Sequence, residues 1–254
     1  MSRPTGATAL LAVTSVAALA AGVHAAPSVT TFGPMRHRVL PRLSGIGRPD
    51  HIALTFDDGP DEASTPQFLD VLAAADVRAT FFVLGEMLGR APELGRRMVE
   101  AGHELAVHGW THRNLLLRGP VATRRELRRT IALIEDVTGT SPRFYRPPYG
   151  VLSFGALAAA RATGLQPVLW TGWGEDWSAS ATPSSVLRTL EPDLSGGATL
   201  LLHDSDCTSA PQAWRSALGA LPPLLERCRA AGWTVGPLAE HDLSTAYLPH
   251  ARSD

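Results

Sequence analysis

Two adjacent carboxylates, Asp57 and Asp58, follow a short β-rich run and precede the turn residues Gly59-Pro60. Neighbouring side chains of a strand point to opposite faces, so both carboxylates can reach one site only if the chain turns after them. Gly and Pro predict that turn. The pair is therefore a candidate for chemistry, although an acidic turn exposed to solvent has the same local sequence.

Two histidines, His108 and His112, are four residues apart in the sequence HGWTH. Such positions share a face of a helix, and a strand end that leads into a helical turn would also bring them together. Two neutral imidazoles with one carboxylate form a three-ligand metal site that keeps an open position for water. Asp58, His108 and His112 are therefore candidate ligands, the alternative being one histidine in the core and one at the surface.

Short β-rich runs alternate with helical patterns along most of the chain. We expect strands at 51–56, 79–84, 104–108, 143–146, 167–171, 198–203 and 233–236. We expect helices at 65–75, 93–100, 121–137, 154–163, 184–190 and 212–230. Seven β/α units in about 200 residues predict one parallel, barrel-like domain, with a doubly wound open sheet as the alternative.

The polar motifs fall at the ends of these expected strands. Asp57-Asp58 directly follows the first strand, whereas His108, Arg146 and His203 close the third, fourth and sixth. In parallel β/α folds the chemistry gathers at the carboxyl ends of the strands. The four clusters are therefore expected on one face of the sheet, which predicts an enzyme.

The composition is that of a folded globular chain. Of 254 residues, 44% are hydrophobic and 19% are charged, which excludes a disordered or collagen-like chain. The 23 basic residues are all Arg and nearly cancel the 24 acidic ones. This balance argues against nucleic acid as a partner and against anchoring by anionic lipid.

Residues 1–26 are typical of a secretory signal peptide. Arg3 precedes an apolar run over 7–21, and small residues near Ala25 suit cleavage. The run is shorter than the roughly 20 residues that span a bilayer, although an uncleaved anchor or a cytosolic helix is the alternative. We expect a leader at 27–50, a catalytic domain at 51–240 and a tail at 241–254. The mature protein would be secreted or held in the cell envelope, without stable membrane insertion.

The two cysteines, Cys207 and Cys228, are candidates for a disulfide because an exported protein permits one. A continuous helix from about residue 212 would carry Cys228 roughly 24 Å away, at 1.5 Å per residue. A bridge needs Cα atoms within about 7 Å. The sequence leaves the pairing open, because Pro222-Pro223 could break that helix.

Five motifs occur in a fixed order: TFDDGP at 55–60, HGWTH at 108–112, RPPYG at 146–150, Asp176-Trp177, and LLHD at 201–204. In these motifs the chain resembles the polysaccharide deacetylases of the NodB-homology type, carbohydrate esterase family 4, over about residues 52–238. The resemblance implies a distorted parallel (β/α)7-type barrel as a single catalytic domain. It also implies metal-dependent removal of N- or O-acetyl groups from carbohydrate.

The resemblance further implies catalytic roles for matched residues. Asp57 corresponds to the general base, His203 to the general acid, and Arg146 to the residue that holds Asp57 in place. The backbone N–H of Tyr149 corresponds to a donor for the oxyanion. These residue types suit amide hydrolysis, because a carboxylate can take a proton from water and a histidine can deliver one to the leaving amine.

By the same resemblance, one divalent metal ion would bind to Asp58, His108 and His112. Two imidazoles and one carboxylate favour Zn²⁺, and Co²⁺, Ni²⁺ or Mn²⁺ could occupy the same ligands. Metal coordination polarises a carbonyl and lowers the pKa of bound water.

The chain departs from the family at Trp173, where the family usually has an Asp that orients the acid histidine. Asp176 is the first candidate to replace that Asp, ahead of Glu175 and Asp242. Asp176 could instead be a structural hydrogen-bonding partner.

Four aromatic residues near the strand-end motifs are candidates for stacking on sugar rings: Trp110, Tyr149, Trp173 and Trp177. Packing of the barrel rim is the alternative for each of them.

The sequence thus predicts an exported, metal-dependent hydrolase that removes N-acetyl or O-acetyl groups from a carbohydrate. Peptidoglycan, chitin-type oligomers or another envelope glycan are the expected partners. The alternatives are an O-acetyl esterase, a hydrolase of small linear amides, and a catalytically silent carbohydrate-binding protein.

Overall fold

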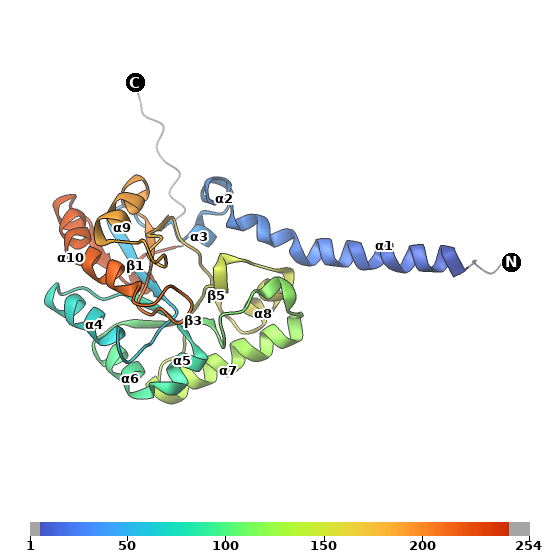
Figure 1. The fold of residues 1–254 in the computed structure, drawn as a ribbon, viewed down its shortest axis with the longest axis horizontal. Coiled ribbons are helices and arrows are strands. Elements are labelled where there is room, and N and C mark those ends of the chain that lie inside the picture. Colours follow the sequence, from blue (N-terminus) through green and yellow to red (C-terminus); the bar gives the residue numbers. More distant parts are fainter. Residues whose placement is uncertain (1–5, 244–254) are drawn as a thin grey trace, which may run out of the picture.

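The structure is a computed structural model that describes residues 6–243. Its centre is one parallel sheet, with helices around it (Figure 1). The strands are β1 (His51–Asp57), β2 (Thr80–Leu84), β3 (Glu104–Gly109), β4 (Phe144–Tyr145), β5 (Gln166–Pro167), β6 (Gly172–Trp173), β7 (Thr199–His203) and β8 (Thr234–Gly236). The order is β5-β4-β3-β2-β1-β7-β6, and β8 also pairs with β1. The sheet curls into a distorted barrel that is open between β5 and β6, which confirms the predicted fold class.

The helices begin and end where local sequence favours it. They are α1 (Gly6–Ala25), α2 (Gly33–Val39), α3 (Pro41–Ser44), α4 (Thr65–Ala74), α5 (Gly85–Arg90), α6 (Pro92–Glu100), α7 (Pro120–Thr138), α8 (Phe154–Ala162), α9 (Pro183–Leu190) and α10 (Trp214–Ala230). Pro lies in the first turn of α6, α7 and α9, where its missing N–H is harmless. Gly139 ends α7 in the left-handed conformation, as a C-terminal glycine does.

Alternation along β1 divides the core into two layers. Ile52, Leu54 and Phe56 face outward toward the helices, where the Phe56 ring stacks on Phe81 with centroids 4.9 Å apart. Ala53 lies in a smaller inner cluster. Asp57 follows the same inward alternation, so the strand delivers its carboxylate to the interior of the barrel.

The prediction of a single strand at 167–171 is wrong. Its place is taken by β5, which pairs with β4, and by β6, which pairs with β7 on the other side of the opening. The backbone between them bonds to several partners: Val168 N–H donates to Tyr145 O at 2.9 Å and Leu169 N–H to Leu43 O at 2.7 Å. A single strand cannot form, because these acceptors belong to different segments.

The segment predicted as a leader, 27–50, contains α2 and α3 and lies against the barrel opening. Besides Leu43 O, it supplies Gly45 O, which accepts a hydrogen bond from Thr199 Oγ1 at 2.6 Å. The leader therefore closes part of the gap between β5 and β6. Neither α2, α3 nor α5 was expected from the sequence.

α1 extends away from the barrel as a long helix (Figure 1). Among the described residues, no helix is long and apolar enough to cross a membrane. The signal-peptide prediction for 1–26 remains a prediction, and residues 1–5 of it lie outside the described residues. The same holds for residues 244–254 of the expected tail.

The cysteines are both free thiols, Cys207 at the surface and Cys228 buried in α10. α10 continues through Pro222 and Pro223, so the break that would have shortened the gap to Cys207 does not occur.

Two buried histidines, His51 and His241, join β1 to the segment after β8. Their Nδ1 atoms are 2.8 Å apart, and His241 Nε2 lies 3.0 Å from Gly45 O and 3.1 Å from Gly197 O. Burial lowers the pKa of each histidine to about 4, and mutual repulsion adds to the effect at His51. Both are therefore neutral in the folded protein near neutral pH.

This pair predicts acid sensitivity. The folded-state pKa values of both histidines lie below the usual 6.5. The contribution of the pair to the free energy of unfolding is therefore fully present above about pH 6.5 and is lost as pH falls toward 4. The loss should reach a few kcal/mol, because lowering a pKa by one on folding corresponds to about 1.4 kcal/mol. The free energy of unfolding in urea should be measured for the wild type and for His51→Asn. The difference in free energy of unfolding between the two proteins should shrink as pH falls from 6.5 to 4. A difference that does not change with pH would contradict the prediction.

Candidate functional site

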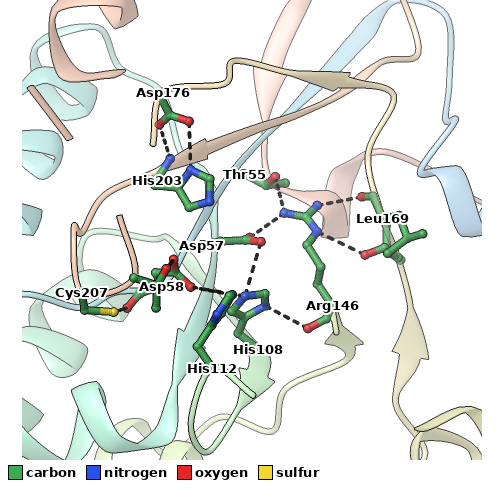
Figure 2. A network of polar contacts seen from close by, with 12 residues as sticks. Thr55, Asp57, Asp58, His108, His112, Arg146, Leu169, Asp176, His203 and Cys207 are labelled. Carbon is green, nitrogen blue, oxygen red and sulfur yellow. Dashed lines mark hydrogen bonds and ion pairs between the residues drawn. The ribbon is translucent and has the colours of Figure 1, made fainter. Parts of the chain in front are cut away.

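A cavity of about 1010 Å³ lies at the carboxyl ends of the strands. Its wall includes the strand-end residues Asp57, Asp58, His108 and His203, together with His112. Arg146 lies directly behind Asp57 and is fully buried. The structure thus brings together the polar clusters that the sequence placed at separate strand ends (Figure 2).

Asp58, His108 and His112 form a compact group of three ligand atoms, all within 4.8 Å of one another. Asp58 Oδ1 is 3.3 Å from His108 Nε2 and 3.6 Å from His112 Nε2. Ligand atoms around a tetrahedral Zn²⁺ are separated by a similar distance, about 3.3 Å for bonds near 2 Å. Asp58 Oδ1 is buried and has no hydrogen-bond partner among the described residues. The three donors therefore fit a metal ion, which would satisfy that oxygen.

The protonation states suit ligation. His108 Nδ1 lies 2.9 Å from Arg146 O, so it carries the proton and leaves the Nε2 lone pair free. Burial and the neighbouring His108 lower the pKa of His112 to about 4, which keeps it neutral. Burial opposes ionisation of Asp58, but the contact with His108 and the nearby His203 outweigh it and lower the pKa of its carboxyl below the usual range.

Asp57 is held by one arginine. Arg146 Nη1 donates to Asp57 Oδ1 at 2.6 Å and to Thr55 Oγ1 at 2.8 Å, while its Nη2 donates to Leu169 O at 2.8 Å. Asp57 Oδ2 is left facing the histidines, 3.8 Å from His108 Nε2. The arrangement orients one free carboxylate oxygen toward the three ligand atoms (Figure 2).

Asp176 holds His203 by two bonds. Its Oδ1 is 2.9 Å from His203 Nδ1, and its Oδ2 accepts from the His203 backbone N–H at 2.7 Å. Burial lowers the pKa of His203, but the charge and hydrogen bond of Asp176 outweigh it and raise the pKa to about 10. His203 is thus an imidazolium near neutral pH. The family usually has an Asp at the position of Trp173, and three residues were candidates to replace it: Asp176, Glu175 and Asp242. The two bonds to His203 come from Asp176.

Three indoles form a row along the cavity wall. Trp170 and Trp173 have ring centroids 5.9 Å apart, and Trp173 stacks on Trp177 at 6.2 Å with planes 21° apart. Trp177 is 46% exposed and Tyr149 59% exposed, so both present aromatic surface. Sequence reasoning missed Trp170, because the run containing it was interpreted as a strand. Its position three residues before Trp173 was the available signal.

Trp110 does not line this cavity. The guanidinium of Arg129 lies 3.4 Å from the centroid of its ring, and the ring packs against Gly85, where an added Cβ would be 2.5 Å from it. The indole is therefore covered by α5 and α7. The expectation that Trp110 contacts sugar has no support in its packing.

Tyr149 adopts a left-handed backbone conformation, with φ 59° and ψ 9°. Its ring lies edge-on to His112 with centroids 4.3 Å apart. The residue belongs to the cavity wall, beside the candidate metal ligands. A strained conformation next to a candidate site is typical of functional positions.

The leader contributes another part of the wall, including Pro34, Arg36 and Arg38. Arg36 is buried and donates to Thr30 O at 2.7 Å and to Trp170 O at 2.5 Å. It therefore ties α2 to the row of indoles. No motif or periodicity in the sequence indicated this contact.

Comparison with known proteins gives consistent results. Residues 45–168 match the family described as polysaccharide deacetylase. A chitooligosaccharide deacetylase of Bradyrhizobium sp. (strain ANU 289) is 38% identical over 203 residues, which cover 74% of this chain and 89% of that protein. The peptidoglycan-N-acetylglucosamine deacetylase PgdA of Listeria monocytogenes serotype 1/2a (strain 10403S) is 36% identical over 159 residues. These residues cover 63% of this chain and 33% of that protein. The solved structure of peptidoglycan deacetylase PdaC from Bacillus subtilis superposes with a TM-score of 0.67 and 28% identity. The match covers 78% of this chain and 90% of that chain.

Proposed function

The chain belongs to the polysaccharide deacetylase family, and from that premise we propose that it is an exported, metal-dependent hydrolase that removes N-acetyl groups from N-acetylglucosamine units. A chitin-type oligosaccharide or peptidoglycan is the proposed substrate, as the names of the relatives indicate for those proteins. The observation that carries the proposal is the meeting of three ligand atoms with a free Asp57 oxygen and His203 in one cavity.

Asp58, His108 and His112 would hold the ion, with Zn²⁺ favoured and Co²⁺, Ni²⁺ or Mn²⁺ as alternatives. When bound there, a divalent ion supplies Lewis-acid polarisation of the acetyl carbonyl and acidifies a water molecule. Asp58 Oδ1 supports this assignment, because it is buried and has no hydrogen-bond partner among the described residues.

The remaining steps belong to the side chains. Asp57 accepts the proton of the attacking water, and the hydrogen bond from Arg146 orients that carboxylate. The backbone N–H of Tyr149 donates to the developing oxyanion. His203, kept protonated by Asp176, gives its proton to the sugar nitrogen as the C–N bond breaks, which releases acetate and a free amine. The indole row and the Tyr149 ring offer aromatic faces to the sugar.

Export rests on the signal-peptide pattern of residues 1–26, and it places the enzyme where envelope glycans are accessible. The leader would remain after cleavage at that pattern, together with its part of the cavity wall.

The test is acetate release by the protein lacking residues 1–26. The substrates are N-acetylglucosamine oligomers, peptidoglycan, acetylated xylan and a small linear amide, each with a chelator and with added Zn²⁺ or Co²⁺. We expect acetate from one of the first two, a loss of about 10²-fold or more with chelator, and recovery on adding metal. Acetate from xylan alone would identify an O-acetyl esterase. No acetate from any substrate, with Zn²⁺ bound, would refute the proposed activity.

A further inference from the structure

The loop after β7 lies across Asp58. Thr208 Oγ1 in this loop donates a short hydrogen bond to Asp58 Oδ2, and Cys207 Sγ lies 3.5 Å from the Asp58 carbonyl oxygen (Figure 2 shows Cys207). Thr208 also belongs to the cavity wall. It lies outside the motifs that carry the family resemblance, and the proposed mechanism assigns it no step.

The two oxygens of the Asp58 carboxylate have different surroundings. Oδ1 faces His108 Nε2 and His112 Nε2, whereas Oδ2 is occupied by the Thr208 hydroxyl. An ionised carboxylate offers about four lone-pair sites, so it could otherwise rotate or present both oxygens to an ion. The hydroxyl therefore selects which oxygen faces the candidate metal site.

The loop is held in place independently of Asp58. Cys207 N–H donates to Ser205 Oγ at 3.1 Å, and Ala210 N–H donates to Trp177 O at 3.0 Å. Asp58 itself is fully buried and has a left-handed backbone with φ 78°. The donor is thus presented by a tethered loop to a carboxylate whose backbone is constrained.

We propose that Thr208 is a positioning residue of the candidate metal site, whose hydroxyl holds Asp58 Oδ2 so that Oδ1 alone is directed to the ion. This inference rests on the proposed function. A hydrogen bond to an ionised acceptor is about twice as strong as a neutral one. Loss of a partner that orients a metal ligand typically costs about 10–100-fold in metal affinity.

The test compares Thr208→Val, which keeps the shape and removes the hydroxyl, with Thr208→Ser, which keeps the hydroxyl. Thr189→Val is the matched control, because Thr189 lines the same cavity from α9 and makes no bond to the three ligands. The Kd for Zn²⁺ is measured on metal-free protein by competition with a chromophoric chelator. The visible spectrum of the Co²⁺ form reports the coordination directly.

We expect Thr208→Val to raise the Kd by about 10-fold or more and to alter the Co²⁺ spectrum. The Kd of Thr208→Ser should stay within about 3-fold of the wild-type Kd, because the hydroxyl is kept. The Kd of Thr189→Val should equal that of the wild type. A wild-type Kd in Thr208→Val, while Asp58→Asn abolishes binding, would overturn the role of Thr208 alone. Zn²⁺ binding that survives Asp58→Asn would overturn the metal site itself, and the inference with it.

Discussion

Asp57→Asn is expected to lower kcat for deacetylation by about 10²–10⁴-fold, with KM close to that of the wild type. An amide cannot accept the proton of the attacking water, whereas the substrate contacts of the cavity wall are unchanged. The measurement is steady-state acetate release from N-acetylglucosamine oligomers, together with sugar affinity by calorimetry. Lost turnover with retained affinity would support an enzyme over a silent carbohydrate-binding protein.

Asp57→Asn needs a control for folding and for metal binding. Arg146 is fully buried, and removal of its charged partner costs about 3–5 kcal/mol at buried ion pairs. The melting temperature and the Kd for Zn²⁺ must therefore be measured on the same preparation. Because Asp57 is not among the proposed ligands, Zn²⁺ should still bind. Substantial turnover in a folded, Zn²⁺-loaded variant would rule out Asp57 as the general base.

Asp176→Asn is expected to shift the alkaline limb of the plot of kcat against pH to lower pH and to lower kcat near pH 8 by about 30-fold. Asp176 raises the pKa of His203 to about 10, so the wild-type histidine stays protonated through neutral pH. Without the carboxylate the pKa falls toward its usual value, and the acid form is lost as pH rises through it. The measurement is kcat against pH with Zn²⁺ saturating.

Glu175→Gln provides the matched control for this profile. Glu175 lines the same cavity next to Asp176 in the chain, whereas the two bonds that hold His203 come from Asp176. Its substitution should leave the position of the alkaline limb unchanged. An alkaline limb that stays in place in Asp176→Asn would show that Asp176 is a structural partner and not the residue that sets the acid.

Sequence reasoning predicted the fold class and the family, and both are confirmed. The alternation of strands and helices predicted a parallel α/β fold with its strand ends on one face, and the five ordered motifs predicted the family and its distorted barrel. The positions of Asp57, Asp58 and His203 follow from that geometry alone, because each lies at the end of a strand. Their assigned roles stay predictions.

Sequence reasoning failed where contacts depend on the paths of irregular segments. The expected strand at 167–171 splits because its backbone bonds are divided between β4, β7 and the leader. For Trp110, the alternative of packing at the barrel rim fits better than contact with sugar, because the Arg129 guanidinium lies over its ring. Neither outcome has a signal in local periodicity, since each is set by residues far away in the chain.

Local sequence was enough to identify the residues that could do chemistry and the face on which they gather, since β-strand alternation and strand-end placement are local properties. Tertiary packing decided which partners complete the site, including the choice of Asp176 among the three carboxylates that the sequence offered for His203. Asp176 instead of a residue at position 173, Arg36 on the Trp170 carbonyl and Thr208 on Asp58 are pairings between separate segments. Such pairings follow from how loops pack over the barrel, and a one-dimensional pattern does not encode that packing.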